Sequence, residues 1–366
     1  MKGMLRPLII GDLRIEVPII QGGMGVRVST STLAAAVAEC GAAGTIASVG
    51  LPMDTAENRA DVAGSTRAKL KEEIKTARSL TKGVVGVNVM VALTDFEDIA
   101  RGAAEANADY IISGAGLPLS LPEYTEGYPS KLIPMISSAR GAEVLLKGWK
   151  RRYNRLPDAI VVEGPLSGGH IGGHSLSSLV GGELTLLENS VREVLSTVRE
   201  YEKRYGVTIP VIAAGGIFDG KDMARFLKMG ASGVQIGTRF IATNECSAAP
   251  AYKKLFVEAD ENSLVFIQSP VGLPARVIRT KFIDEMLKGA THPISCNYRC
   301  LRTCNPETAP FCIAKALIDA VEGDIDNAVV FASSYVAKIK KIVPVKELIE
   351  EITSEAALEM KKKGEE

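Results

Sequence analysis

A series of short apolar segments between residues 17 and 236 constrains the fold of this chain more than any other feature. Each segment is continuously apolar and is followed by a longer stretch with helical spacing. Continuous apolar character is typical of strands that are buried on both faces of a parallel sheet. We therefore predict strands over residues 17–21, 43–48, 84–89, 110–113, 132–136, 159–163, 210–214 and 233–236.

The segments between these strands carry helix-ending signals. Residues 29–40 are closed by Gly41 and residues 219–229 by Gly230, and glycine favours the left-handed backbone that ends many helices. Eight strand-then-helix units predict an α/β protein with a (β/α)₈ TIM barrel. The alternative is an open, doubly wound sheet with G-x-G-x-x-G after its first strand, but GGMG stands at 22–25.

The alternation of strands and helices stops after residue 241. The remaining segment contains proline-rich loops, a helix predicted over 313–321, and a charged amphipathic helix over 345–366 that we expect to fray. We divide the chain into a barrel over 1–248 and a C-terminal, cysteine-containing extension over 249–366 that packs on it. Turn residues over 114–130 predict a loop over the mouth of the barrel.

The charge composition of the chain disfavours some classes of binding partner. The 43 Lys and Arg residues balance 43 Asp and Glu residues, so no broad cationic field favours nucleic acid or an acidic membrane surface. No apolar run approaches the length of a membrane span, and the first residues lack the pattern of a secretory signal. We expect a cytoplasmic protein that binds a small molecule, and a homodimer is one prediction for its assembly.

Two glycine-bearing loops follow the last two predicted strands. AAGGI occupies 213–217 and GTR occupies 237–239, which are the positions where TIM barrels commonly bind phosphate. Glycine lets backbone N–H groups approach an anion closely. Phosphate binding is our preferred interpretation, and tight turns without a ligand are the alternative.

The loop after the sixth strand reads EGPLSGGHIGGH over 163–174 and contains two of the three histidines of the chain. Imidazole titrates near neutral pH and serves as a general acid or base. Glycine neighbours offer no apolar face to pack against, so we favour a catalytic role for His170 and a lesser one for His174. The alternative is a packed or solvated histidine.

Polar and glycine residues after other strands complete a predicted site. The first strand is followed by Gly22, Gly23 and Met24, the third ends near Asn88, and the fifth is followed by Ser137. An amide both donates to and accepts from the edge of a heteroaromatic ring. These groups predict a site for a flat ring with a phosphate tail, although Asn88 is alternatively a barrel-packing amide and the serine a helix cap.

Four cysteines crowd into a segment of the extension, at Cys296, Cys300, Cys304 and Cys312. Thiolates are ligands of zinc and of iron–sulfur clusters, and a cytoplasmic protein keeps its cysteines reduced. An iron–sulfur cluster is one hypothesis. Zinc binding and plain reduced or redox-labile thiols are the alternatives.

Several motifs resemble one enzyme family. They are PIIQGGMG at 18–25, GVN at 86–88, EGxxxGGHIG at 163–172, PVIAAGGI at 210–217 and GVQIGTRF at 233–240. In their order and spacing they are similar to the nitronate monooxygenase family, formerly 2-nitropropane dioxygenases, which includes the flavin-dependent enoyl-ACP reductase FabK. Family members commonly carry an acidic residue and alanine before GGH, where this chain has Leu166 and Ser167.

The resemblance implies an FMN-containing TIM barrel. It assigns the flavin ring to Gly22, Gly23, Met24 and Asn88, the FMN phosphate to Gly215, Gly216, Gly237 and Thr238, and catalysis to His170. Ser137, Gly168 and Gly169 complete the predicted flavin contacts.

Three functions follow from these predictions. The first is oxidation of nitronates or nitroalkanes with dioxygen, with His170 as the catalytic base. The second is NAD(P)H-dependent reduction of an enoyl thioester, as in FabK, and the third is a non-enzymatic flavin or electron-transfer protein. IMP dehydrogenases and GMP reductases share the phosphate loops, but no cysteine stands beside residues 237–239.

Overall fold

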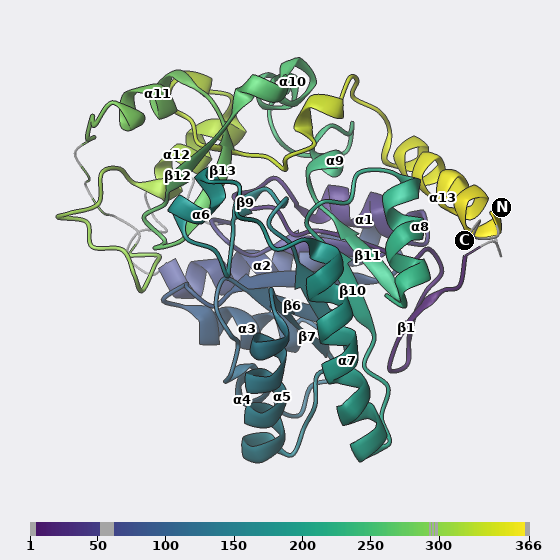
Figure 1. Cartoon of the computed structure of the whole chain (residues 1–366). Coiled ribbons are helices and arrows are strands. Elements are labelled where there is room, and N and C mark those ends of the chain that lie inside the picture. The colour runs from purple at the N-terminus through teal and green to yellow at the C-terminus, as the bar shows by residue number, and fades with distance from the viewer. Residues whose placement is uncertain (1–4, 52–61, 293, 295, 297–298, 363–366) are drawn as a thin grey trace.

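The computed structural model describes residues 5–51, 62–292, 294, 296 and 299–362. Its centre is a parallel sheet in the order β3-β11-β10-β8-β7-β6-β5-β4. Parallel pairing between Ile20 and Ala43 joins the two ends of this order, so the sheet closes into a barrel (Figure 1). The barrel strands are β3 (Ile19–Gln21), β4 (Gly44–Ala47), β5 (Val85–Met90), β6 (Tyr110–Gly114), β7 (Lys131–Ile136), β8 (Ile160–Glu163), β10 (Val211–Ala214) and β11 (Gly233–Ile236).

Helices surround these strands, and the predicted (β/α)₈ barrel is confirmed. Along α8, Asp219 caps the first turn by accepting from Asp222 N, and Gly230 ends the helix in the left-handed conformation, as predicted. The helices of the barrel are α1 (Ser31–Glu39), α2 (Val62–Leu80), α3 (Phe96–Glu105), α4 (Leu121–Tyr124), α5 (Ala139–Tyr153), α6 (Leu176–Val180), α7 (Leu187–Tyr205), α8 (Gly220–Met229), α9 (Thr238–Ile241) and α13 (Val345–Lys361). No helix among the described residues is long and apolar enough to span a membrane.

Large apolar side chains fill the interior of the barrel. Tyr110 occupies its middle, where a Cβ at Gly86 would stand only 2.3 Å from the tyrosine ring. Tyr110 donates to Gly44 O at 2.8 Å, which satisfies the buried hydroxyl. A hairpin of β1 (Leu8–Ile10) and β2 (Leu13–Ile15) closes the lower end with buried Leu8, Ile10 and Ile15.

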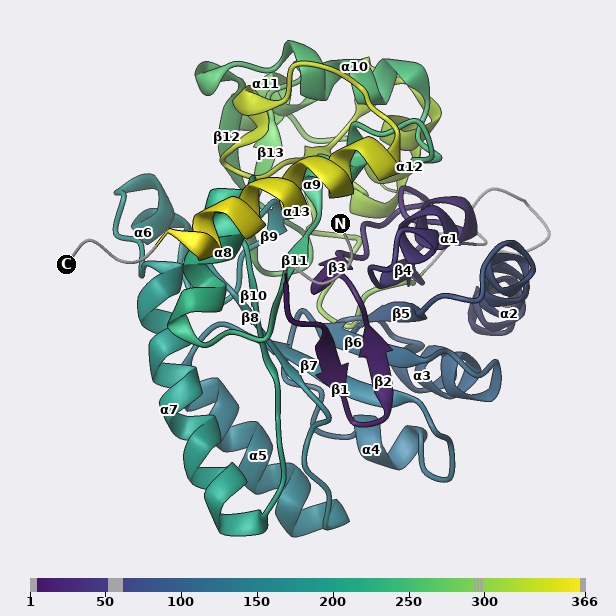
Figure 2. The same ribbon diagram turned by 90° about the vertical axis from the view of Figure 1, so that its right-hand side faces the viewer.

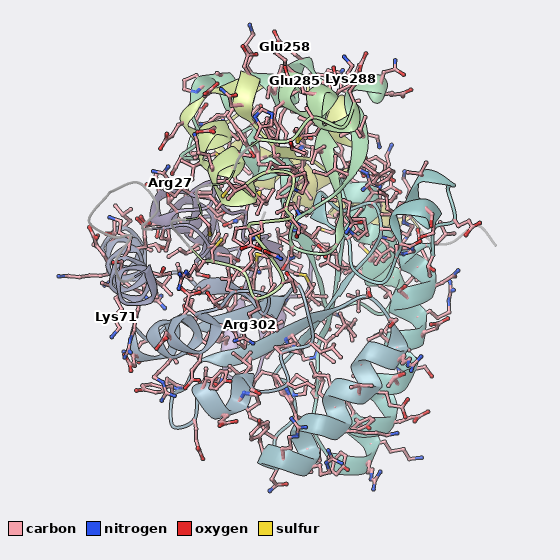
Figure 3. The ribbon with its side chains drawn as sticks, turned by 90° about the vertical axis from the view of Figure 1, so that its left-hand side faces the viewer. Arg27, Lys71, Glu258, Glu285, Lys288 and Arg302 are labelled. Atoms are coloured by element: carbon pink, nitrogen blue, oxygen red, sulfur yellow. The ribbon has the colours of Figure 1, made fainter. Side chains whose placement is uncertain are left out.

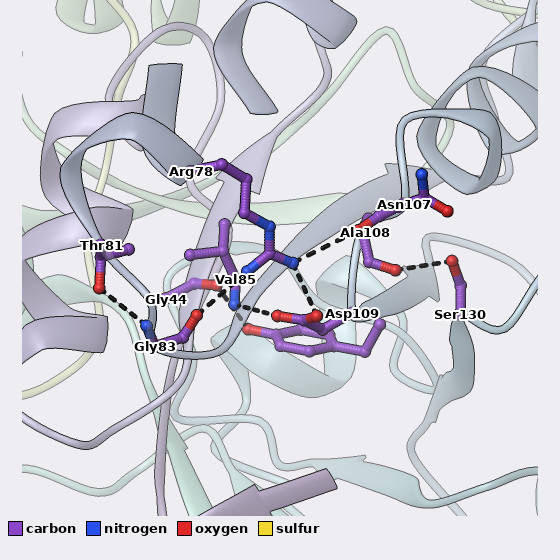
Figure 4. Close-up of polar contacts among 10 residues, drawn as sticks. Gly44, Arg78, Thr81, Gly83, Val85, Asn107, Ala108, Asp109 and Ser130 are labelled. Atoms are coloured by element: carbon purple, nitrogen blue, oxygen red, sulfur yellow. Dashed lines mark hydrogen bonds and ion pairs between the residues drawn. The ribbon is translucent and has the colours of Figure 1, made fainter. Parts of the chain in front are cut away.

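Hydrogen bonds and one ion pair hold the strand starts at this lower end together (Figure 4). Arg78 of α2 pairs with Asp109 at 2.6 Å and donates to Gly83 O at 3.1 Å. Asp109 in turn accepts from Val85 N at 2.8 Å. In TIM barrels the lower face serves stability and the upper face carries function, so this network belongs to the scaffold.

The terminal helix α13 occupies the place of the eighth barrel helix (Figure 2). It packs against α8 and α1 through a buried stripe that includes Leu348 and Ile352. A Cβ at Gly220 would lie 2.4 Å from Ile352 O, so glycine there permits the close crossing of α8 and α13. The expectation that this helix frays is therefore wrong for its described part.

A segment inserted between β11 and α13 covers the top of the barrel (Figure 1, green to yellow). In its sheet β13 pairs with β12, with β14 and also with β9, which comes from the loop after β8. β9 (Gly169–His170) joins this sheet from the barrel loop, and the elements of the inserted segment are α10 (Pro250–Glu258), η2 (Glu261–Ser263), β12 (Leu264–Gln268), β13 (Pro274–Ile278), α11 (Lys281–Leu287), α12 (Ile313–Glu322), η3 (Ile325–Asn327), β14 (Val330–Phe331) and η4 (Val336–Lys338). The division at residues 248 and 249 stays a prediction.

Backbone and side-chain contacts anchor this segment on the barrel loops, and two of the residues involved, Arg27 and Arg302, are labelled in Figure 3. Arg27, after β3, pairs with Glu322 of α12 at 2.6 Å. After β5, Thr94 N donates to Cys300 O at 3.1 Å, and Arg302 N donates to Ala92 O at 3.0 Å. The roof of the site therefore has a defined position above the strand ends.

The turn-rich stretch over 114–130 does not form the predicted loop over the mouth. Its helix α4 packs on the outside of the barrel, between α3 and α5. Trp149 of α5 donates to Pro118 O at 3.0 Å, and Tyr124 contacts Phe96 edge to face. Burial of Leu121 against these aromatic side chains explains why the stretch folds outward.

Candidate active site

A cavity of about 250 Å³ lies between the upper ends of the strands and the roof. Side chains alternate between the inside and the outside of a barrel strand, so inward residues near the upper ends of the strands form the floor. These floor residues are Asn88 of β5, Gly114 of β6, Met135 of β7, Glu163 of β8, Ala214 of β10 and Gln235 of β11.

The loop after β3 forms one wall of the cavity through Gly22, Gly23 and Met24. A Cβ at Gly23 would lie 2.3 Å from the Cβ of Asn88, so only glycine lets this backbone lie against the floor amide. Ser29 Oγ accepts from Met24 N at 3.0 Å and fixes the turn. The wall therefore offers flat, unhindered backbone beside Asn88.

The two glycine loops follow the neighbouring strands β10 and β11, and the loop after β11 lies against the wall formed by Gly22 and Met24. Gly215 and Gly216 have φ values of +79° and +113°, which non-glycine residues rarely adopt. The short helix α9 starts after Gly237, and Thr238 Oγ1 accepts from Ser333 N of the inserted segment at 3.0 Å. These loops have the arrangement of a TIM-barrel phosphate site.

Arg239, the cation that follows β11, makes its hydrogen bonds with Phe218 and Glu351. Arg239 donates to Phe218 O at 3.1 Å and pairs with Glu351 of α13 at 3.0 Å. Arg239 therefore ties α13 to the loop after β10. The backbone N–H groups of the glycine loops are further donors for an anion at this end of the cavity.

His170 lies on β9, where it pairs with Ala275 of β13. Its Nε2 is 2.8 Å from Ser269 Oγ, and its ring meets Phe331 edge to face at 5.0 Å. Burial lowers the pKa of His170 to about 4, because no carboxylate compensates for the lost hydration of the imidazolium. The histidine is therefore neutral at physiological pH, and Ser269 orients its ring.

A buried arginine stabilises the loop that carries this histidine. Arg276 of β13 donates to Ser167 O at 2.5 Å, and its guanidinium lies over the ring of Phe266. Burial lowers the pKa of Arg276 to about 10, so the side chain stays charged at neutral pH. A charged donor makes a strong hydrogen bond, which fixes the loop between β8 and β9.

The structure brings most of the predicted site residues together. Gly168, Gly169 and His170 line the cavity with the predicted glycines, Met24, Asn88 and Thr238. Ser137 and His174 are not among the lining residues. A Cβ at Gly173 would stand 2.7 Å from Ser137 Oγ, so this serine lies against the turn of the histidine loop instead.

The part of the cysteine cluster that the structure describes gives no metal site. Among the described residues, no group of three or more His, Cys, Asp or Glu side chains is arranged to hold a metal ion. Burial, followed by the nearby thiols of Cys312, Cys296 and Cys304, raises the pKa of Cys300 to about 12. Cys300 lines the cavity as a neutral thiol, and nothing in the structure supports the predicted iron–sulfur cluster.

Sequence reasoning assigned no role to several lining residues. Glu163 and Gln235 point into the floor, which alternation along their strands would have indicated. Ser269, which contacts His170, and the lining residues Phe331 and Ser333 come from the inserted segment. No local sequence signal marks these three, because only the tertiary fold brings them to the cavity.

The cavity fits a flavin mononucleotide. Ser167 Oγ and Gln235 Oε1 are buried without a hydrogen-bond partner in the described part of the chain, and both residues line the cavity. Buried polar atoms need partners, so these two suit a polar ligand. The glycine walls suit a flat ring, and the paired glycine loops suit a phosphate.

Comparison with known families agrees with this fit. The sequence model described as "Nitronate monooxygenase" matches residues 6–115 and 108–355. The chain belongs to the nitronate monooxygenase family. Membership makes it an oxidoreductase whose cofactor is FMN.

Relatives of this family member differ in their described substrates. A Mycobacterium tuberculosis protein, named as a dehydrogenase of a hydroxy-methyl-oxo-octahydroindene carboxyl-CoA, is 28% identical over 78% of this chain and 70% of its own length. A probable nitronate monooxygenase of Staphylococcus aureus is 29% identical over 75% of this chain and 78% of its own length. The structure of FabK from Thermotoga maritima has a TM-score of 0.73 and 30% identity, covering 95% of both chains.

We expect the purified protein to carry non-covalent FMN. The cavity provides one phosphate site, and no dinucleotide motif that would suit an adenosine half follows the first strand. Acid precipitation followed by chromatography of the supernatant should release FMN, with free FMN and FAD as standards. Recovery of FAD, or flavin that stays attached to the precipitated protein, would contradict this prediction.

Proposed function

We propose that this protein uses NAD(P)H to reduce the carbon–carbon double bond of an α,β-unsaturated thioester with an apolar acyl chain. The observation that carries this proposal is the apolar roof of the cavity. The residues that the inserted segment contributes to it, among those described, carry no charge. They are Tyr252, Val271, Cys300, Leu301, Ile313, Ala314, Leu317, Phe331 and Ser333.

An apolar roof favours a hydrocarbon chain, because each buried methylene contributes about 0.8 kcal/mol. Leu93 of the barrel extends the same surface. Nitronates of small nitroalkanes are compact anions, and a buried anion needs a cation or several donors. His170 is neutral and Arg239 is paired with Glu351, so the charges of the site favour a neutral substrate.

The proposed reaction transfers one hydride from NAD(P)H and one proton from solvent water to the double bond. NAD(P)H gives up a hydride, the β-carbon of the enoyl thioester receives it, and the α-carbon receives a proton, which yields NAD(P)⁺ and the saturated thioester. Bound FMN would supply the centre that carries the hydride between the two substrates.

This chain's residues would hold the reactants. The glycine wall and Asn88 would hold the ring, and the loops after β10 and β11 would hold the phosphate. Neutral His170, oriented by Ser269, would hydrogen-bond the thioester oxygen and polarise the double bond. A histidine with a pKa near 4 is a weak base at neutral pH, which disfavours removal of the α-proton from a nitroalkane.

The relatives lend this proposal independent support. Similarity to FabK covers 95% of this chain and so includes the segment that forms the roof. The name of the M. tuberculosis relative describes a coenzyme A thioester. NAD(P)H as the donor, the homodimer and the cytoplasmic location stay predictions.

Parallel assays on one preparation of the holoenzyme test the function. NADH or NADPH oxidation is followed under anaerobic conditions with crotonyl, octenoyl and dodecenoyl thioesters, and oxygen uptake is followed with propionate 3-nitronate. We expect enoyl-dependent oxidation of the nicotinamide, with the saturated thioester as product. Nitronate turnover without enoyl reduction would reject the proposal in favour of the monooxygenase function.

Filling the roof should shorten the accepted chain. We expect Leu317→Trp to lower kcat/KM for a dodecenoyl thioester about tenfold or more, while the crotonyl thioester is affected less, because one misplaced methylene group already costs ~1–3 kcal/mol. Leu287→Trp is the matched control, since Leu287 is 53% exposed on α11. Equal losses for both chain lengths would show that the roof does not hold the acyl chain.

A further inference from the structure

Glu163 stands at the floor of the flavin cavity without a partner. It is the last residue of β8, and the alternation along this strand points its carboxyl into the cavity. In the described part of the chain, no hydrogen bond or ion pair reaches this carboxyl. Backbone pairing sets Glu163 beside Ala214 of β10, and Ala214 beside Gln235 of β11.

The surroundings of Glu163 favour its uncharged form. The pairing of β10 with β8 places Ala214 next to it, Met135 of β7 also lines the cavity, and neither side chain solvates a carboxylate. Burial alone raises the pKa of Glu163 to about 7. A flavin in the cavity would displace the remaining water and favour the uncharged acid further.

The other ionisable groups of the cavity do not titrate near neutral pH. Burial lowers the pKa of His170 to about 4, and burial raises the pKa of Tyr252 and of Cys300 well above neutrality. Arg239 is paired with Glu351, and Arg276, behind the histidine loop, stays charged while it donates to Ser167 O. Among the described lining residues, Glu163 is therefore the group that can exchange a proton in this range.

We propose that Glu163 takes up a proton when the flavin binds, so that the floor presents a neutral carboxylic acid to the isoalloxazine ring. The acid would then act as a hydrogen-bond donor, a capacity that the carboxylate lacks. Ser167 Oγ and Gln235 Oε1, which are also buried without a hydrogen-bond partner among the described residues, would complete the polar surface against the ring. Flavin affinity then depends on pH through this one residue.

Proton uptake by Glu163 fixes the direction in which flavin affinity changes with pH. Above the pKa of the empty site the carboxylate must gain a proton on binding, so affinity falls as pH rises. The limit is about a tenfold loss of affinity for each pH unit. In Glu163→Gln the amide is neutral at every pH, and this dependence disappears.

Titration of the apoprotein with riboflavin tests the proposal without any turnover. Riboflavin lacks the phosphate of FMN, whose own second ionisation near pH 6 would otherwise contribute. Flavin fluorescence quenching between about pH 7 and pH 9 should show a falling affinity for the wild type and a flat profile for Glu163→Gln. Glu183→Gln, at an exposed glutamate between α6 and α7, is the matched control and should keep the wild-type slope.

Calorimetry of the wild-type apoprotein gives a second readout that needs no variant. Riboflavin binding measured at about pH 8 in two buffers of different ionisation enthalpy counts the protons taken up, and we expect a value approaching one. A value near zero would overturn the proposal. An unchanged pH slope in folded Glu163→Gln would overturn it as well, because another group would then carry the linkage.

Discussion

Replacement of His170 by alanine is expected to lower kcat/KM on the true substrate at least about 100-fold while FMN stays bound. The neutral imidazole lines the cavity and is oriented by Ser269, so its loss removes a positioned hydrogen-bonding group. Most of the residues assigned to flavin binding stay in place. Steady-state kinetics and the flavin absorbance of the purified variant measure the two effects separately.

His174→Ala provides the control for this experiment. His174 belongs to the same glycine-rich loop but does not line the cavity, so its removal should change turnover little. Because burial holds the pKa of His170 near 4, this residue should contribute no step to the pH–rate profile between about pH 6 and pH 8. Full activity in His170→Ala would show that the histidine is structural.

Replacement of Gly215 by alanine is expected to abolish flavin retention. This glycine has a φ of +79°, and an alanine Cβ there would stand 2.5 Å from Gly164 O. Backbone strain of this kind costs ~1–3 kcal/mol, and relief of the clash would displace the loop assigned to the phosphate. We expect a colourless variant whose affinity for added FMN is lowered about 100-fold or more.

Gly206→Ala separates backbone strain from loss of the site. Gly206 also has a positive φ, +65°, but no atom lies within 4 Å of the position of its Cβ, and it ends α7 away from the cavity. This variant should bind FMN normally at some cost in stability. If Gly215→Ala, folded by circular dichroism, also retains FMN, our assignment of the phosphate to this loop is wrong.

The barrel could be predicted because its strands carry local signals. The strand predicted over 233–236 coincides with β11, and the one predicted over 110–113 differs from β6 by a single residue. Strands buried on both faces must be apolar throughout, so each of them can be recognised from its own short apolar segment. The glycine loops were recognisable for a similar reason, since positive φ values and close approaches select glycine locally.

The outer layers were predicted less well because their positions depend on remote partners. The stretch over 114–130 contains turn residues, yet its place outside the barrel depends on Trp149 and Phe96, which lie on α5 and α3. The charged terminal helix looked free to fray, but α8 offers Gly220 as a surface for close packing. Contacts of this kind between distant segments leave no repeating pattern in the local sequence from which they could be predicted.

The features of the candidate site also fall into those set by local sequence and those set by contacts between distant segments. The barrel, the glycine loops, Asn88 and the histidine loop could be named from the sequence, because each depends on backbone geometry or on residues within one segment. Only the tertiary structure decided that His170 joins the sheet of the inserted segment and contacts Ser269, and that Glu163 stands unpartnered in the floor. The pKa values of both groups arise from burial by residues far apart in the chain, which no single segment of the sequence encodes.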